Sequence, residues 1–325
     1  MNSAAWLLRG LLAALLGMTS EIVLWTAPDA RPLFDWMVVS AAYLALSALL
    51  LDLAARYRLR DLYGLMALAG IYGLINAALL NPATAFVDFP RTFFTRAMGG
   101  HTLMGLLALA LWLRLTDGRP LRRAGRVFTG ALAVCLGGVW GYWAHYAPPV
   151  FAAGADTPLI AVVGWFALFV VLTLALTAAL RRSALSLPVE SFRLSRAGGA
   201  FVLIALLPVL VARLTAGALD GVQSATVILF ALFCAGIIWF QKRRKGATLL
   251  DARSTAVPLS ALGALFALTL IAGVIGYHLP RGGSEADPLA VIGSLLTAYG
   301  LVWLPLVTFV LGAREFNKQA RAMRL

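Results

Sequence analysis

Charged residues, cysteines and histidines are scarce in this 325-residue chain, and their scarcity excludes several classes of protein. Only 13% of the residues are charged and 61% are hydrophobic, whereas a soluble domain is about half apolar and a quarter charged. The chain could not cover its surface with polar groups in water, so we expect an integral membrane protein. Its two cysteines, Cys135 and Cys234, each lie alone in an apolar stretch, which argues against a disulfide framework.

The three histidines give no metal signature. No HxxxH or HExxH pattern occurs, and no histidine stands four residues from a carboxylate. These are the spacings by which one helix presents two metal ligands on the same face. We therefore assign no metal ligands, and the sequence leaves any cofactor unknown.

Acidic residues are also few, and the formal net charge is +13. In a soluble protein this excess would suggest nucleic acid as a partner. Here the basic residues flank apolar stretches, where they orient membrane helices and meet anionic lipid headgroups. We expect membrane lipids as partners, leave room for protein partners within the membrane, and expect no nucleic acid.

Long apolar runs are what the chain has in abundance. A helix needs about 20 mostly apolar residues to cross the hydrocarbon core, and backbone groups in lipid must bond internally. Both rules predict an all-α, polytopic membrane bundle, one domain over residues 1–325 with antiparallel helical hairpins. The ten predicted spans are 5–26, 33–53, 62–81, 94–115, 125–147, 158–180, 197–217, 223–241, 257–278 and 288–312.

The distribution of positive charge predicts the orientation of these spans. The N-terminus, the loops after spans two, four, six and eight, and the C-terminus carry 22 of the 27 Lys and Arg, while the opposite side carries 5. Such a bias is typical of cytoplasm on the basic side. We expect a multi-pass protein of a bacterial-type inner (plasma) membrane with both termini cytoplasmic.

A short glycine motif recurs in three of the predicted spans. It reads Ala-Gly-Ile-Tyr-Gly at 69–73, Gly-Gly-Val-Trp-Gly at 137–141 and Ala-Gly-Val-Ile-Gly at 272–276. Small residues at such spacing let helix backbones approach closely without lipid between them. Close helix packing is the main interpretation, and a substrate groove lined by glycine backbone is the alternative.

Ionisable residues gather near the extracytoplasmic ends of the spans, whereas the span centres stay apolar. An ionisable side chain inside the bilayer is costly, so its position indicates function or a specific partner. Five candidate site residues follow from this layer: Glu21, His101, Arg213, His145 and Arg96.

Glu21 and His101 are the sharpest of these candidates. Glu21 could be neutral, or it could pair with Arg96 or Arg213 as a structural ion pair; its functional role would be a general base or a proton or cation site. His101 could make an interhelical hydrogen bond, or it could serve as a general base, metal ligand or haem ligand. His145 ends its span among aromatic residues, as interfacial side chains often do.

Three classes of function fit the layer of polar residues. The first is an enzyme or binding protein for a lipid or lipid-linked group in the extracytoplasmic leaflet, which the apolar span centres favour. The second is a small-solute transporter or channel, although transporters usually place polar groups near the midplane. The third is a structural or haem-binding redox subunit of a membrane complex.

Overall fold

The computed structural model describes residues 3–26, 28, 31–118, 123–146, 157–182, 186–241, 246–251, 253–280 and 288–322. Within these ranges the chain forms ten helices that are long and apolar enough to cross a membrane. The prediction of a helical membrane bundle with ten spans is confirmed by the length and composition of these helices.

The helices are interrupted by a few short elements, and three segments of the spans are π-helical rather than α-helical. The order is α1 (Ser3–Gly17), η1 (Met18–Val23), α2 (Leu33–Arg56), α3 (Leu62–Ile75), η3 (Asn76–Leu80), α4 (Pro82–Ala85), η4 (Phe93–His101), α5 (Thr102–Leu115), α6 (Arg123–His145), α7 (Leu159–Arg181), β1 (Ser186–Leu187), η5 (Val189–Phe192), α8 (Arg196–Thr215), α9 (Gly221–Gln241), β2 (Arg253–Ser254), α10 (Leu259–Tyr277) and α11 (Pro288–Ala322). The π-helical segments are η1, η3 and η4, and η5 is a 3-10 turn.

Local signals explain where several helices begin. The Asp61 side chain accepts a hydrogen bond from the Gly64 amide at the start of α3, and Ser195 caps α8 in the same way. Such caps satisfy backbone donors that have no partner within the helix. Prolines precede α2, α7 and α10, where a residue without an N–H costs no helical hydrogen bond. Two further prolines, Pro208 in α8 and Pro305 in α11, lie in helix interiors.

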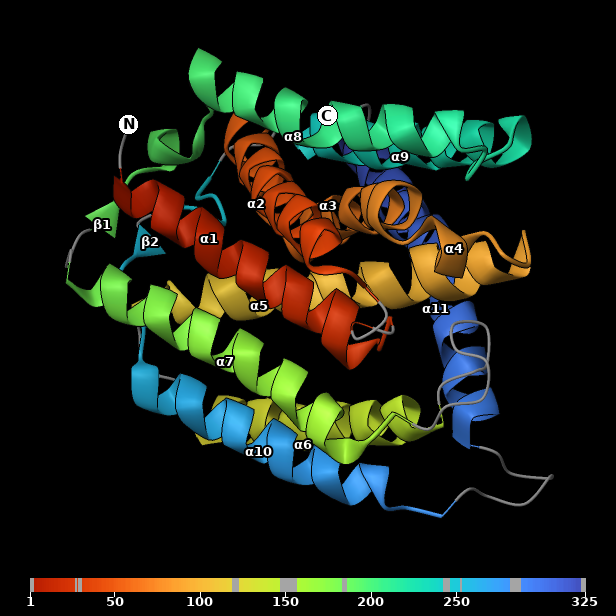
Figure 1. The fold of residues 1–325 in the computed structure, drawn as a ribbon. Coiled ribbons are helices and arrows are strands. Elements are labelled where there is room, and N and C mark those ends of the chain that lie inside the picture. The colour runs from red at the N-terminus through yellow and green to blue at the C-terminus, as the bar shows by residue number, and fades with distance from the viewer. Residues whose placement is uncertain are drawn as a thin grey trace.

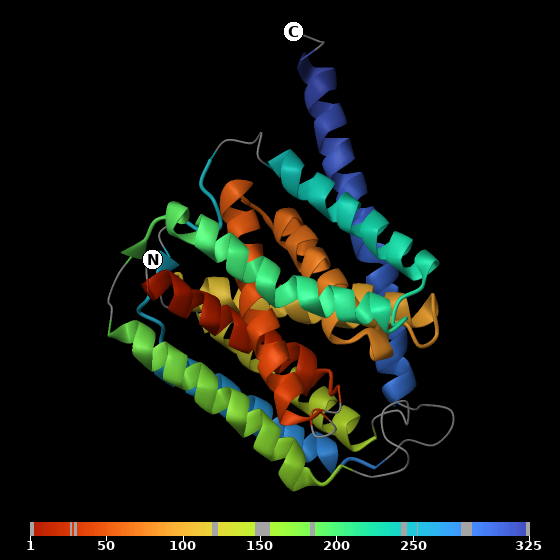
Figure 2. The ribbon, with the colours of Figure 1, turned by 45° about the horizontal axis from the view of Figure 1, so that its top comes forward.

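The first four spans form the core of the bundle, and the last six cover it. The central windows of spans one and three are 83% and 78% buried, while those of spans seven and eight are 11% and 17% buried. In Figure 1, α8 and α9 lie along one side of α1–α5, and α6, α7 and α10 lie along the other. Figure 2 shows the C-terminal turns of α11 extending beyond the other helices. Polar groups that point into the first four spans, such as Glu21 and Asn76, are therefore shielded from lipid.

The segments that follow spans two, four, six and eight contact one another. The Leu249 amide donates to the Leu59 carbonyl at 2.7 Å, and the Ser254 amide donates to the Thr116 carbonyl at 2.7 Å. Strands β1 and β2 pair antiparallel, with Leu187 opposite Arg253. These arginine-rich segments are thus joined into one surface, which we call the basic face.

Glycines permit the closest helix contacts in the bundle. A Cβ on Gly141 would overlap the Gly273 carbonyl, and a Cβ on Gly276 would overlap the Gly138 carbonyl, so α6 and α10 pack backbone to backbone. A Cβ on Gly73 would likewise overlap Thr102. All three copies of the glycine motif lie at helix contacts, and the packing interpretation of the motif is confirmed.

Candidate functional site

Glu21 lies at the centre of a buried group of polar side chains on the first three spans. Its side chain is fully buried. Tyr43 and Asn81 donate to Glu21 Oε1 at 2.6 and 2.9 Å. Thr26 donates to Oε2, and the Arg31 guanidinium lies 3.2 Å from the same oxygen. A carboxylate has about four acceptor sites, so the protein itself occupies the hydrogen-bonding capacity of Glu21.

The hydrogen bonds continue from Glu21 to His101 through three further side chains. Asn76 donates to the Tyr43 hydroxyl at 2.7 Å and lies 3.3 Å from the Tyr72 hydroxyl. The Tyr72 hydroxyl is 2.6 Å from Ser20 Oγ, which lies 3.3 Å from His101 Nδ1. We call the connected set the polar network; it consists of Ser20, Glu21, Thr26, Arg31, Tyr43, Tyr72, Asn76, Asn81 and His101. The structure thus brings Glu21 and His101 together in one network, although they do not touch.

The π-helical segments carry four of the polar residues of this region. Glu21 is in η1, Asn76 is in η3, and both Arg96 and His101 are in η4. In η3 the Asn81 amide donates to the Asn76 carbonyl five residues back, at 3.0 Å. Such wider turns are rare and occur often at functional sites. The first segment is followed by Trp25, whose φ of 44° is an outlier for a bulky residue.

The polar network is buried and its members have protein partners, although Arg31 Nη1 has no hydrogen-bond partner among the described residues. Glu21 and Asn76 are fully buried, and His101 is only 1% exposed. Because each member already has protein partners, a general base at Glu21 would first have to break one of four contacts. This arrangement indicates that the polar network holds the first four spans in a fixed relative position. It does not favour direct contact between the network and a substrate.

Arg96 lies in the same layer of the bundle as Glu21, but unlike Glu21 it has no polar partner in the described part of the chain. Only 9% of the residue is exposed, and its guanidinium lies 4.7 Å from the centre of the Trp143 ring. Among the described residues the guanidinium has no hydrogen-bond acceptor and no carboxylate partner. A buried cation without a counter-charge is costly, so this position requires an explanation.

The last turn of α6, which brings Trp143 against Arg96, holds further unmatched polar atoms. Trp143 Nε1, the Tyr142 hydroxyl and His145 Nδ1 are buried and have no hydrogen-bond partner among the described residues. Arginine and tryptophan side chains can only donate. We call Arg96, Tyr142, Trp143 and His145 the donor cluster. Arg96 and Trp143, which are in contact, can be satisfied together by an acceptor-rich, negatively charged ligand.

The five predicted site residues therefore fall into three places. Glu21 and His101 belong to the polar network, and Arg96 and His145 belong to the donor cluster. Arg213 belongs to neither, because its Nε donates to the Leu79 carbonyl at 3.0 Å. The proposed pairing of Glu21 with Arg96 or Arg213 is wrong: the ion pair is with Arg31, which lies in the segment between spans one and two and reaches back to Glu21.

Sequence reasoning missed Tyr43, Arg31 and Asn81 as partners of Glu21. One signal was present for Tyr43, since a tyrosine within an apolar span must find a partner for its hydroxyl. No comparable signal marks Arg31 or Asn81, which lie in connecting segments. No known protein family matches the chain, and no curated protein or solved structure does.

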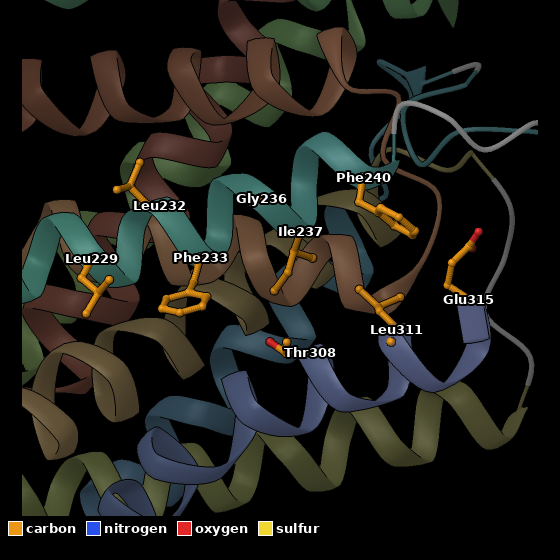
Figure 3. Close-up of a pocket in the computed structure, with 10 residues that line it drawn as sticks. Leu229, Leu232, Phe233, Gly236, Ile237, Phe240, Thr308, Leu311 and Glu315 are labelled. Atoms are coloured by element: carbon orange, nitrogen blue, oxygen red, sulfur yellow. The ribbon is translucent and has the colours of Figure 1, made fainter. Parts of the chain in front are cut away.

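A separate groove of about 490 Å³ lies between α9 and α11. Figure 3 shows its apolar side chains, with Phe233 and Ile237 on α9 facing Thr308 and Leu311 on α11. None of the five predicted site residues lines it. Within the described ranges, no group of three or more His, Cys, Asp or Glu is placed to hold a metal ion.

Proposed function

We propose that this multi-pass membrane protein binds the anionic group of a lipid or lipid-linked compound in the extracytoplasmic leaflet, with Arg96 as the anion contact. The basic face lies in the cytoplasm in this proposal, together with both termini, as the charge bias of an inner-membrane protein favours. The observation that carries the proposal is Arg96, a residue only 9% exposed whose guanidinium has no acceptor among the described residues.

The chemistry of the donor cluster supports an anion over a neutral ligand. A guanidinium presents planar N–H groups that match the oxygens of a phosphate or carboxylate. Trp143 Nε1 adds a neutral donor next to it. A ligand that supplied two or more oxygens would relieve the desolvation of Arg96 and satisfy a second buried donor.

The position of the donor cluster supports a ligand that arrives through lipid. Only 39% of the central window of α6 is buried, and Val134 and Val139 of this helix are exposed on the surface. Apolar side chains of this kind face acyl chains in a bilayer. A lipid-linked group could therefore place its chain along α6 and its charged end at Arg96.

The polar network has a positioning role in this proposal. His101 and Arg96 lie on the same π-helical segment, η4, and His101 joins η4 to Ser20 of η1. Fixing η4 against the first span fixes the backbone from which Arg96 projects. Preorganised donors bind an anion more tightly because less ordering is needed on binding.

The test is binding of a polyprenyl phosphate to the full-length protein in nanodiscs of phosphatidylcholine, measured by native mass spectrometry. Arg96→Gln should weaken binding about tenfold or more, the usual loss for a hydrogen bond to a charged group. Arg91→Gln is the matched control, since Arg91 is exposed and pairs with Asp88. Inorganic phosphate tests whether the anion alone suffices.

Each result has a defined meaning. A loss in the Arg96 variant with the Arg91 variant unchanged supports the proposal, and Arg96→Lys should recover part of the affinity because it keeps the charge. Equal affinity for wild type and Arg96→Gln overturns the proposal. If inorganic phosphate bound as tightly as the lipid-linked form, the lipid part of the proposal would be wrong.

A second candidate function, proton-coupled transport of a small solute, is favoured by the continuity of the polar network. Carboxylate, hydroxyl, carboxamide and imidazole groups lie within hydrogen-bonding distance of one another from Glu21 to His101, with the Asn76 carboxamide between the Tyr43 and Tyr72 hydroxyls. Chains of such groups relay protons in membrane pumps and transporters. The test is proton flux into proteoliposomes with an imposed pH gradient, compared between wild type and Glu21→Gln; equal flux in both removes this candidate.

A further inference from the structure

A second pocket opens at the basic face, and no residue of the donor cluster lines it. Its volume is about 360 Å³, and Arg56, Tyr57, Arg193 and Trp239 line it. These residues come from the end of α2, the segment before α8 and the last turn of α9. Three spans therefore meet around one pocket whose lining is basic and aromatic.

The charges in this pocket are unbalanced toward positive. Arg56 Nε lies 2.6 Å from Asp52 Oδ2. The other oxygen of Asp52 accepts the Leu194 amide at 2.7 Å, so both oxygens are engaged. Arg193 is exposed, and no described carboxylate pairs with it. The pocket region thus has two guanidinium groups and one carboxylate. Asp52 fixes the position of Arg56 and of the segment that carries Arg193.

The aromatic residues place this pocket at the level of lipid headgroups. Tyrosine and tryptophan are enriched where hydrocarbon meets water, because their rings are apolar and their tips are polar. Trp239 is 51% exposed near the end of a membrane-spanning helix. Below it, α8 and α9 expose Leu203, Ile204 and Leu232, which are suitable for contact with acyl chains.

We infer that this pocket binds the headgroup of an anionic phospholipid, with the phosphate between Arg56 and Arg193 and the glycerol region against Trp239. Basic pockets between membrane helices on the cytoplasmic side bind anionic headgroups in this way. The inference is independent of the proposed function, because it concerns different residues on the opposite face of the bundle.

The experiment uses the full-length protein in detergent, titrated with phosphatidylglycerol or phosphatidylcholine and measured by native mass spectrometry. Wild type should prefer phosphatidylglycerol. Arg193→Gln should weaken that binding about fivefold, the loss expected for one basic residue at an anionic surface. Arg196→Gln is the matched control, because Arg196 is also exposed and follows three residues later without lining the pocket.

The outcomes separate a built site from general attraction. A selective loss in Arg193→Gln with Arg196→Gln unchanged supports the inference, and so does a comparable loss in Trp239→Leu. Equal weakening by both arginine variants, or no preference for the anionic lipid, overturns it. Displacement of the lipid by low concentrations of inorganic phosphate would also overturn it, since the site would then recognise the phosphate and not the lipid.

Discussion

Glu21 and Arg96 are both ionisable, both buried and both near the ends of spans that lie away from the basic face, but their surroundings differ completely. Glu21 pairs with Arg31 and accepts hydrogen bonds from three other side chains. Arg96 contacts the face of Trp143 and has no acceptor among the described residues. Partners within the protein satisfy the charge of Glu21, whereas the charge of Arg96 has no such partner in the described part of the chain.

This difference separates two roles that a buried charged residue can have. A buried charge with a full set of partners holds helices in one arrangement, and removal of one partner leaves the others uncompensated. A buried charge without partners lowers stability until a ligand arrives. Substitutions at the two positions should therefore have opposite effects on stability and on binding.

The largest effect on stability is expected for Glu21→Gln. The change removes the counter-charge of Arg31 and replaces one acceptor oxygen by an amide group that donates, so Thr26 and Arg31 lose their acceptor. It should lower the free energy of unfolding by about 3–5 kcal/mol. Denaturation in detergent measures this. Asp35→Asn makes the same chemical change at an exposed position and should have little effect; similar behaviour of the two variants would contradict a stabilising network.

Gly141→Ala should disturb the donor cluster while leaving the polar network intact. The added Cβ would overlap the Gly273 carbonyl and push apart the ends of α6 and α10, at a cost of about 1–3 kcal/mol. Because Trp143 follows two residues later, binding of polyprenyl phosphate should fall as well. Gly164→Ala meets open space and is the control; unchanged stability and binding in Gly141→Ala would show that this contact is not needed.

Tyr43→Phe should have a smaller effect confined to the polar network. It removes one hydrogen bond to Glu21 and one from Asn76, which should cost about 2 kcal/mol. The thermal unfolding midpoint in detergent measures the loss. Tyr63→Phe is the control, since the ring of Tyr63 contacts Arg314 and is kept in the variant. Polyprenyl phosphate binding should survive Tyr43→Phe, and its complete loss would contradict the separation of the two regions.

The smallest change in stability is expected for Arg96→Met. Replacing an unpaired buried charge by an apolar side chain of similar length is often neutral or stabilising, so the free energy of unfolding should stay within about 0.5 kcal/mol of wild type or rise. Binding of polyprenyl phosphate should be lost in the same variant. A marked fall in the unfolding midpoint would show that Arg96 already has protein partners.

Much of the fold could be predicted from the sequence because lipid imposes a simple rule. The predicted third span, 62–81, and the observed helical segment Leu62–Leu80 agree closely, since an apolar run of sufficient length has few alternatives. The layer of candidate residues was also predictable, because buried ionisable groups are rare enough to stand out.

The partners of those residues could not be predicted. The π-helical turns at Glu21 and Arg96 rotate side chains away from the directions that an α-helix would give them. Arg31 reaches Glu21 from a connecting segment whose path the apolar pattern does not specify. The contrast between a satisfied and an unsatisfied charge therefore becomes visible only in the folded chain.

The most direct test of this contrast is an experimental structure of the wild-type protein in nanodiscs that contain polyprenyl phosphate. We predict non-protein density within hydrogen-bonding distance of the Arg96 guanidinium and Trp143 Nε1, with the Glu21–Arg31 pair unchanged. A protein carboxylate or carbonyl bonded to Arg96 in that structure, with no ligand beside it, would contradict the account.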